Sequence, residues 1–287
     1  MPLCFFVSDL HGKIDRYEKL FRLIEDEKPE AVFFGGDLLP SGIYDLTAWA
    51  NATSDFFQDI LVSGFNGLKK RLGSKYPEVF MILGNDDGKG LENEFIEVSN
   101  LGLWNYVHNT KEIFQGYSIY GYSYIPPTPF LFKDWEKYDV SRYIDPGCVA
   151  PEEGYHSSKV KLDDVIYGTI EKDIHQLTNQ DDLSKSIFLF HSPPYQTKLD
   201  RAALDGKMFE HVPLDVHIGS IAIKRFIEER NPFITLHGHV HESTTITGSW
   251  KDQIGKTVAF NAAHEGPELA LIRFDPEKIH ESSRVLI

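Results

Sequence analysis

The sequence predicts an α/β fold in which apolar strands alternate with amphipathic helices. Short apolar runs at residues 3–8, 31–34 and 79–83 are separated by segments with helical periodicity, which is typical of a sheet covered on both faces. Each of these runs ends in polar residues. From residue 106 the pattern changes to an alternation rich in Tyr and Ile, which predicts antiparallel strands and the start of a second sheet.

The first part of the chain is expected to form strand–helix–strand units. Residues 3–8 form the first strand, and apolar residues three or four apart between Ile14 and Ile24 predict the helix that follows it. Residues 31–34 form the second strand. A helix at about 54–72, a strand at 79–83 and a short helix at 92–99 come next. Two antiparallel strands joined at Gly116 then begin the second sheet between 106 and 124.

The second part of the chain opens with an irregular insertion at about 125–162, where prolines recur and no periodicity is visible. A helix at 163–177 and a strand at 187–190 follow it. The polar loop at 195–216 is expected to form a wall of a binding site. A helix at 218–229 and a strand at 233–236 precede a remainder that alternates like strands of the second sheet. We expect residues 1–287 to form one domain.

Composition and charge narrow the class of protein. A hydrophobic content of 41% is ample for a buried core. The 29 basic and 43 acidic side chains give a net charge of −14, which argues against a nucleic-acid binder but permits a small phosphate ester, because bound dications reverse the local field. Cys4 and Cys148 lie too far apart for a redox or metal motif. No leader-like or membrane-spanning apolar run is present in the sequence, so we expect a cytoplasmic protein without a membrane partner.

Five short clusters follow the predicted strands. They are Asp9-x-His11, Gly36-Asp37, Gly84-Asn85, His191 and Gly238-His239-x-His241. Each cluster alone is common, but together they supply imidazole, carboxylate and amide ligands that suit Mn, Fe, Zn or Ni, and the sequence does not choose among these metals. Two divalent ions sharing one carboxylate would generate a metal-activated hydroxide for hydrolysis of phosphate esters.

The order of these clusters resembles the motifs of the calcineurin-like metallophosphoesterase superfamily, which run Asp-x-His, Gly-Asp, Gly-Asn-His-Asp/Glu, His and Gly-His-x-His. The resemblance spans positions 9 to 241. It implies a four-layer α/β/β/α sandwich of two mixed sheets flanked by helices. It also implies that Asp37 bridges two ions, and it divides the other ligands into a first set, Asp9, His11 and His241, and a second set, Asn85, His191 and His239.

The sequence departs from the family in the third motif, where Asp86 replaces the histidine that is thought to act on the leaving group. An aspartate with an ordinary pKa of about 3.9 accepts hydrogen bonds at neutral pH and cannot inherit that role. Three explanations are open: Asp86 contacts metal or water, the leaving group needs little acid help, or activity is partly lost. We favour the second, and hence a phosphodiesterase. Asp87 matches the acidic residue that would orient the missing histidine, so Asp86 and Asp87 are candidate catalytic residues.

Other polar residues flank the ligands. His211, His264 and Arg201 are candidates for substrate binding, although a structural histidine or a solvated loop charge explains each of them as well. The same two interpretations apply to His217, His237 and Lys207.

Three rival functions remain at this stage. A phosphomonoesterase or protein phosphatase fits the metal ligands but lacks the expected histidine. A non-catalytic metal-binding scaffold would be expected to lose ligands, and all seven are present. A nuclease conflicts with the net charge of −14. No feature of the sequence indicates an oligomeric state.

Overall fold

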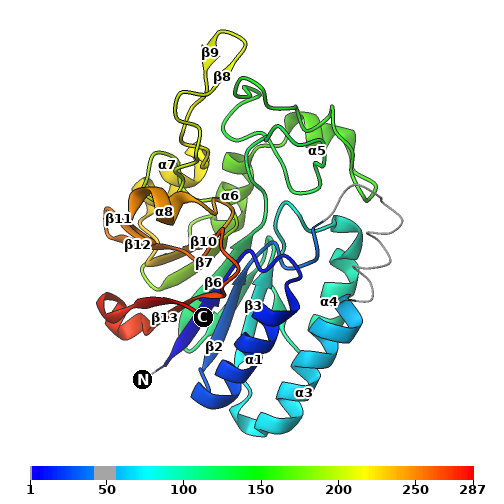
Figure 1. Ribbon diagram of the computed structural model, residues 1–287, viewed down its shortest axis with the longest axis vertical. Helices are drawn as coiled ribbons and strands as arrows, with labels where there is room; N and C mark the ends of the chain where they lie inside the picture. Colours follow the sequence, from blue (N-terminus) through cyan, green and yellow to red (C-terminus); the bar gives the residue numbers. More distant parts are fainter. Residues whose placement is uncertain (1, 42–55) are drawn as a thin grey trace.

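Two mixed sheets lie between layers of helices in the computed structural model, which describes residues 2–41 and 56–287 (Figure 1). The first sheet has six described strands: β1 (Cys4–Val7), β2 (Ala31–Gly35), β3 (Glu78–Ile82), β4 (Asn105–Tyr106), β13 (Ala270–Phe274) and β14 (Ser283–Leu286). Their order is β14-β13-β1-β2-β3-β4. The strands from β1 to β4 are parallel, whereas β13 is antiparallel to both of its neighbours.

The second sheet also has six described strands, in the order β11-β12-β10-β7-β6-β5. They are β5 (Lys111–Phe114), β6 (Tyr117–Tyr122), β7 (Ser186–Phe190), β10 (Ile234–His237), β11 (Lys251–Ile254) and β12 (Thr257–Asn261). The four inner strands are parallel and the two edge strands are antiparallel. The hairpin predicted at Gly116 is present between β5 and β6.

Helices cover the outer face of each sheet (Figure 1). The first sheet packs against α1 (Ile14–Glu27), the π-helical turn η1 (Phe57–Val62), α3 (Ser63–Leu72) and α4 (Glu92–Asn100). The second sheet packs against α6 (Ile170–Thr178) and α7 (Ile221–Arg230). Shorter elements are η2 (Gly73–Lys75), η3 (Lys89–Leu91), α5 (Leu162–Tyr167), α8 (Ser243–Thr247) and η4 (Pro276–Glu281). The four-layer α/β/β/α prediction is confirmed.

The side chains of β1 point alternately into two apolar clusters, which explains why this strand is a continuous apolar run. Phe5 and Val7 pack into the cluster beneath α1 and α3, whereas Cys4 and Phe6 pack into the cluster between the two sheets. All four side chains are fully buried. β1 contains no polar residue, so the polar ligands that it positions follow its end.

The expectation that the whole C-terminal remainder joins the second sheet is wrong. β11 and β12 do so, but β13 pairs with β1 in the first sheet and β14 pairs with β13. Alternation shows that a segment is a strand and not which sheet accepts it. Tyr106, expected in the second sheet, likewise belongs to β4, which pairs with β3 of the first sheet.

Three other expected elements differ in detail. The helix predicted at 163–177 is divided into α5 and α6 at Gly168, because the Thr169 side chain caps α6 by accepting from the Lys172 N–H. The predicted start of a helix at residue 54 lies outside the described residues, and residues 57–62 of that prediction form the π-helical turn η1. The loop at 195–216 contains a small hairpin, β8 (Met208–Phe209) and β9 (Val212–Pro213), which projects from the sheets (Figure 1).

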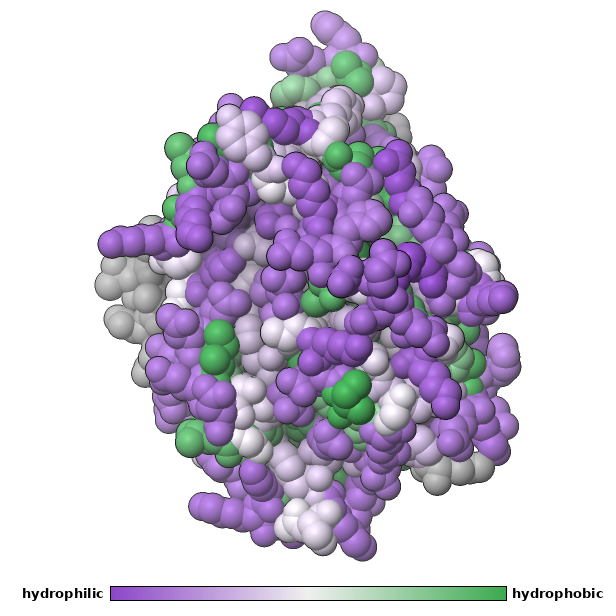
Figure 2. Space-filling view, turned by 180° about the vertical axis from the view of Figure 1, so that it is seen from behind, coloured by the Kyte–Doolittle hydropathy of each residue, from purple (hydrophilic) through white to green (hydrophobic). Residues whose placement is uncertain are grey.

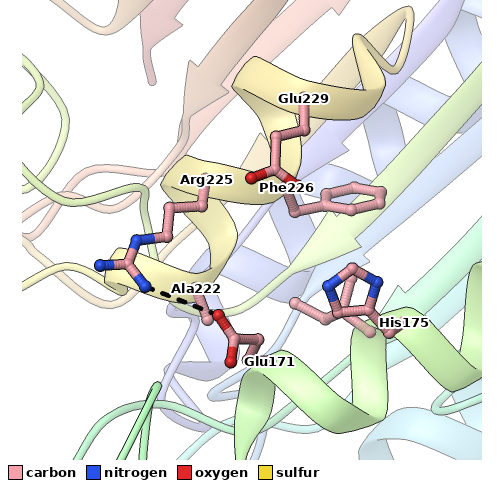
Figure 3. A pocket seen from close by; sticks show the side chains of 7 residues that line it. Glu171, His175, Ala222, Arg225, Phe226 and Glu229 are labelled. Atoms are coloured by element: carbon pink, nitrogen blue, oxygen red, sulfur yellow. Dashed lines mark ion pairs between the residues drawn. The ribbon is translucent and has the colours of Figure 1, made fainter.

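The packing of α6 against α7 leaves a small cleft of about 40 Å³ (Figure 3). The Arg225 guanidinium and the Glu171 carboxylate, 3.6 Å apart, join the two helices across it. This space holds a water molecule or two and no more. We therefore regard it as an imperfection of helix packing.

The molecular surface seen from behind is mostly hydrophilic, with hydrophobic side chains in small scattered groups (Figure 2). Such scattered groups are ordinary on a protein surface. In the part of the chain that the structure describes, no helix combines the length and hydrophobicity needed to span a bilayer.

Candidate metal centre

All seven predicted metal ligands follow strands at one edge of the two sheets. The strands and their ligands are β1 with Asp9 and His11, β2 with Asp37, β3 with Asn85, β7 with His191, and β10 with His239 and His241. Main-chain hydrogen bonds join the loops that carry them: the Asp9 N–H donates to Gly36 O at 2.9 Å, and the Gly238 N–H donates to His191 O at 3.0 Å. The loops therefore form one connected surface.

The first donor set lies close enough to share one cation. Asp9, His11, Asp37 and His241 each offer an atom within 4.8 Å of the others. His241 Nε2 is 3.1 Å from both His11 Nε2 and Asp9 Oδ1. Imidazole nitrogens and carboxylate oxygens that converge in this way fit a divalent transition-metal ion.

The second donor set meets the first at Asp37. His191 Nε2 is 2.9 Å from Asn85 Oδ1 and 3.3 Å from Asp37 Oδ2. The same Asp37 oxygen is 3.9 Å from His11 Nε2, and the His239 ring lies 5.4 Å from the His191 ring. One carboxylate thus faces imidazoles of both sets, which fits a centre of two ions with a shared carboxylate.

The surroundings of two of the ligands, His239 and Asp9, keep them in the forms that bind metal. Burial lowers the pKa of His239 to about 3, so its imidazole is neutral. Burial raises the pKa of Asp9, but the hydrogen bond from His241 and the nearby imidazoles outweigh it and hold that pKa below its ordinary value. Neutral imidazole and ionised carboxylate are the species that coordinate cations.

Four of the ligands have a left-handed backbone. The φ angles of Asp9, His11, Asp37 and His239 are 57°, 48°, 53° and 69°. Non-glycine residues rarely adopt this region, at a cost of about 1–3 kcal/mol each, and they cluster at functional sites where the surroundings impose the conformation. These residues lie in the loops that follow β1, β2 and β10.

Two glycines allow the ligand loops to approach one another. A Cβ atom at Gly84 would lie 2.3 Å from Asp37 Oδ1, and one at Gly238 would lie 2.5 Å from Asp9 Oδ2. No side chain fits at such distances. The glycines that precede Asn85 and His239 are therefore required by the close packing of carboxylates against backbone.

Asp86 contacts a ligand from each donor set. Its Oδ1 accepts from Asn85 Nδ2 at 3.1 Å, its Oδ2 lies 3.4 Å from His11 Nδ1, and its N–H donates to Asp37 Oδ1 at 2.8 Å. Burial and the neighbouring Asp37 raise the pKa of the Asp86 carboxyl to about 7, so the expectation of an ordinary pKa is wrong. Bound dications would favour its ionised form.

Asp87 is fully buried. In place of the histidine that this residue would orient in the family, its partners are backbone N–H groups. Its carboxylate accepts from the N–H groups of Leu38 at 2.9 Å, Leu39 at 2.8 Å and Gly84 at 2.9 Å. These donors belong to the loops after β2 and β3. Asp87 therefore ties the Asp37 loop to the Asn85 loop.

The other candidate residues either pair with groups outside the metal centre or are exposed. His211 is exposed in the turn between β8 and β9, and Arg201 pairs with Asp205 at 2.5 Å. His264 lies 2.9 Å from Glu268. The remaining three are Lys207, which is exposed, His217, whose Nδ1 is 2.9 Å from Asp200, and His237, which is buried between Ser192 O and Thr235 Oγ1. Within the described residues, no hydrogen bond or ion pair joins any of them to the seven ligands.

Sequence reasoning missed Arg16, which supports the Asp9 loop from beneath. Its buried guanidinium donates to Asp9 O at 2.7 Å and to Gly266 O at 2.5 Å. Arg16 lies in the first turn of α1 and belongs to no recognisable sequence motif. Its role depends on contact with a segment 250 positions away. Only the fold brings these two segments together.

A family model for calcineurin-like phosphoesterases matches residues 4–243. The chain belongs to this family. No curated protein sequence matches it. Among solved structures, protein TT1561 of Thermus thermophilus is 17% identical, with 99% of this chain and 98% of that chain covered and a TM-score of 0.56. A dimetal phosphatase from Danio rerio is 9% identical over 100% and 98% of the two chains, with a TM-score of 0.50. At these identities the likeness to the two solved structures shows a shared fold.

Proposed function

We propose that this member of the calcineurin-like phosphoesterase family is a dimetal phosphodiesterase that acts on small phosphate esters. The observation that carries the proposal is the convergence of two donor sets on Asp37. We assign Asp9, His11 and His241 to one ion, and Asn85, His191 and His239 to the other. When bound, two divalent ions would polarise the phosphoryl group, activate the attacking water and counter the charge on the leaving oxygen.

Asp86 has a positioning role in this proposal. By accepting from the Asn85 amide nitrogen, it directs the Asn85 oxygen toward His191. By facing His11 Nδ1, it directs Nε2 toward the first donor set. Carboxylates that hold the far side of metal-binding side chains in this way fix their orientation and raise their affinity for metal.

The preference for diesters follows from charge. The Asp86 side chain is 31% exposed at the centre, and its ionised form repels a dianionic monoester more strongly than a monoanionic diester. The family's leaving-group histidine is also replaced by Asp86, which favours substrates whose leaving group needs little acid assistance.

The first experiment compares two matched substrates. Protein stripped of metal is reconstituted separately with Mn²⁺, Fe²⁺, Zn²⁺ and Ni²⁺ and assayed with bis(p-nitrophenyl) phosphate and with p-nitrophenyl phosphate. We expect a higher kcat/KM for the diester with at least one metal. A consistently higher value for the monoester would refute diester specificity while leaving the metal assignment intact.

The second experiment tests the bridging ligand. Asp37→Asn should lose both bound metal and hydrolysis, because the remaining amide oxygen cannot neutralise two ions. Asp59→Asn, at an exposed position on η1, is the matched control and should retain both. Full metal content and turnover in Asp37→Asn would contradict the assignment.

A further inference from the structure

A second cavity lies beside the metal centre, between the end of β6 and residues 134–165. Its volume is about 440 Å³, and polar side chains dominate its wall. Lys89, the first residue of η3 and four positions after Asn85, contributes to this wall. Tyr122 does so too, and its backbone oxygen accepts from the His191 N–H. We propose that this cavity binds a phosphate-sized anion, either free or carried as a second acidic group of the substrate.

Three lysines of the wall lie beyond ion-pair distance of every described carboxylate. Lys89, Lys159 and Lys161 form no ion pair within the described structure. Lys159 and Lys161 are exposed, whereas Lys89 is half-buried and its ammonium donates to Tyr124 Oη at 2.5 Å. An ammonium group withdrawn from water is favourable only when an opposite charge or several acceptors compensate it.

Aromatic rings hold the Lys89 ammonium in place without neutralising it. Its nitrogen lies 4.5 Å from the centroid of the Trp135 ring and 4.9 Å from that of Tyr124. A cation over an aromatic face gains about 0.5–2 kcal/mol, but its charge remains available to an anion. The lysine is thus preorganised toward the cavity.

The carboxylates of the wall are mostly committed to internal donors. Asp134 accepts from Lys89 N and from Ser157, and Glu136 is paired with the buried Lys133 at 2.5 Å. Asp173 accepts from Tyr122 Oη at 2.8 Å and from Lys137 at 2.5 Å. Their oxygens therefore have little capacity left for a ligand.

Asp164 is the remaining carboxylate of the wall, and it is exposed near the rim. Three ammonium groups without an ion pair thus face two carboxylates without a lysine partner, Asp134 and Asp164. In a chain of net charge −14, this local excess of positive charge marks the cavity as a place where an anion is favoured.

The His156 Nδ1 atom of the wall lacks a hydrogen bond in the described part of the chain, although Asp134 Oδ1 lies 3.8 Å from it. His156 Nδ1 is buried and has no hydrogen bond within the described structure, while its Nε2 lies 3.2 Å from Pro151 O. Buried polar atoms are normally satisfied by protein, water or ligand. A protonated phosphate oxygen could donate to this nitrogen while the other oxygens accept from the lysines.

The test measures binding of inorganic phosphate to the full chain freed of metal, so that failure of the proposed dimetal chemistry cannot influence it. We expect the melting temperature to rise with phosphate concentration at constant ionic strength. We also expect the fluorescence emission of Trp135 to change, and the variant Trp135→Phe identifies the contribution of this residue to the signal. Lys89→Met should weaken the Kd for phosphate at least about tenfold, the loss of one charge-assisted hydrogen bond.

Two further variants make the result decisive. Lys256→Met, at an exposed position in the β11–β12 turn, is the matched control and should bind phosphate like the natural sequence. The double variant K159M/K161M changes only exposed side chains and should also weaken binding. Absence of phosphate binding, or equal Kd values in the natural sequence, Lys89→Met and K159M/K161M, would overturn the proposal.

A kinetic comparison separates the two sources of the anion. In metal-loaded enzyme, Lys89→Met should raise KM for a diester that carries a second phosphate, and leave KM for bis(p-nitrophenyl) phosphate unchanged, if the cavity holds part of the substrate. Unchanged KM for both diesters, together with lost phosphate binding, would identify a site for a free anion.

Discussion

Replacement of Asp86 by alanine tests whether this residue organises the metal centre. The substitution removes the acceptor for the Asn85 amide at 3.1 Å and the carboxylate that faces His11 Nδ1 at 3.4 Å. It preserves the main-chain N–H that donates to Asp37. The change therefore affects one ligand from each donor set while leaving the bridge in place.

The expected loss of metal affinity follows from the number of ligands that lose their contact with the Asp86 carboxylate. Loss of a hydrogen-bond partner behind a metal ligand reduces metal affinity by about 10–100-fold, which corresponds to about 1.4–2.8 kcal/mol. Because Asn85 and His11 belong to different donor sets, we expect both ions to bind at least about tenfold more weakly. The Asn85 amide would also be free to turn its NH₂ group toward the second ion, where a donor repels a cation.

The assay is a Mn²⁺ titration of metal-free protein, followed by electron paramagnetic resonance of the free ion. Asp86→Asn should lie between the natural sequence and Asp86→Ala, because an amide can accept from His11 but cannot also accept from Asn85. Circular dichroism and the melting temperature of the metal-free variants control for folding. Mn²⁺ affinities that are equal in all three proteins would refute the positioning role.

Two further predictions concern packing. Gly84→Ala should reduce Mn²⁺ affinity at least about tenfold, because its Cβ would displace Asp37 Oδ1, whereas Gly90→Ala, whose Cβ would meet nothing closer than 3.4 Å, should not; equal effects in the same titration would contradict the steric argument. Glu136→Gln should lower the free energy of unfolding in urea by about 3–5 kcal/mol, because it leaves the fully buried Lys133 ammonium uncompensated. The control Glu18→Gln breaks an exposed pair and should cost less than about 1 kcal/mol, so similar losses would count against a buried-charge penalty.

The edge where the ligands meet could be predicted because it depends on local patterns. β1, β2 and β3 contain no buried polar residue, so Asp9, Asp37 and Asn85 follow the strand ends, and parallel strands bring those ends to one edge. The division into layers also follows from the alternation of Phe5 and Phe6 between two apolar clusters.

The features that the sequence did not predict depend on contacts between distant segments. The pKa of Asp86 is set by its burial and by Asp37, which lies 49 positions earlier in the chain. The backbone partners of Asp87 and the support of the Asp9 loop by Arg16 are likewise invisible before folding. Assignment of β13 to the first sheet needs the pairing of Phe274 with Cys4, which no periodicity encodes.

The position of β13 protects β1, the strand that leads to the ligands Asp9 and His11. The family match ends at residue 243, yet β1, which leads to Asp9 and His11, is hydrogen-bonded on one side to β13. A protein shortened to the matched region would expose the N–H and C=O groups of this fully apolar strand, which is a template for intermolecular pairing and aggregation. The C-terminal strand pair, although it supplies no ligand, thus shields the strand that supplies the first two.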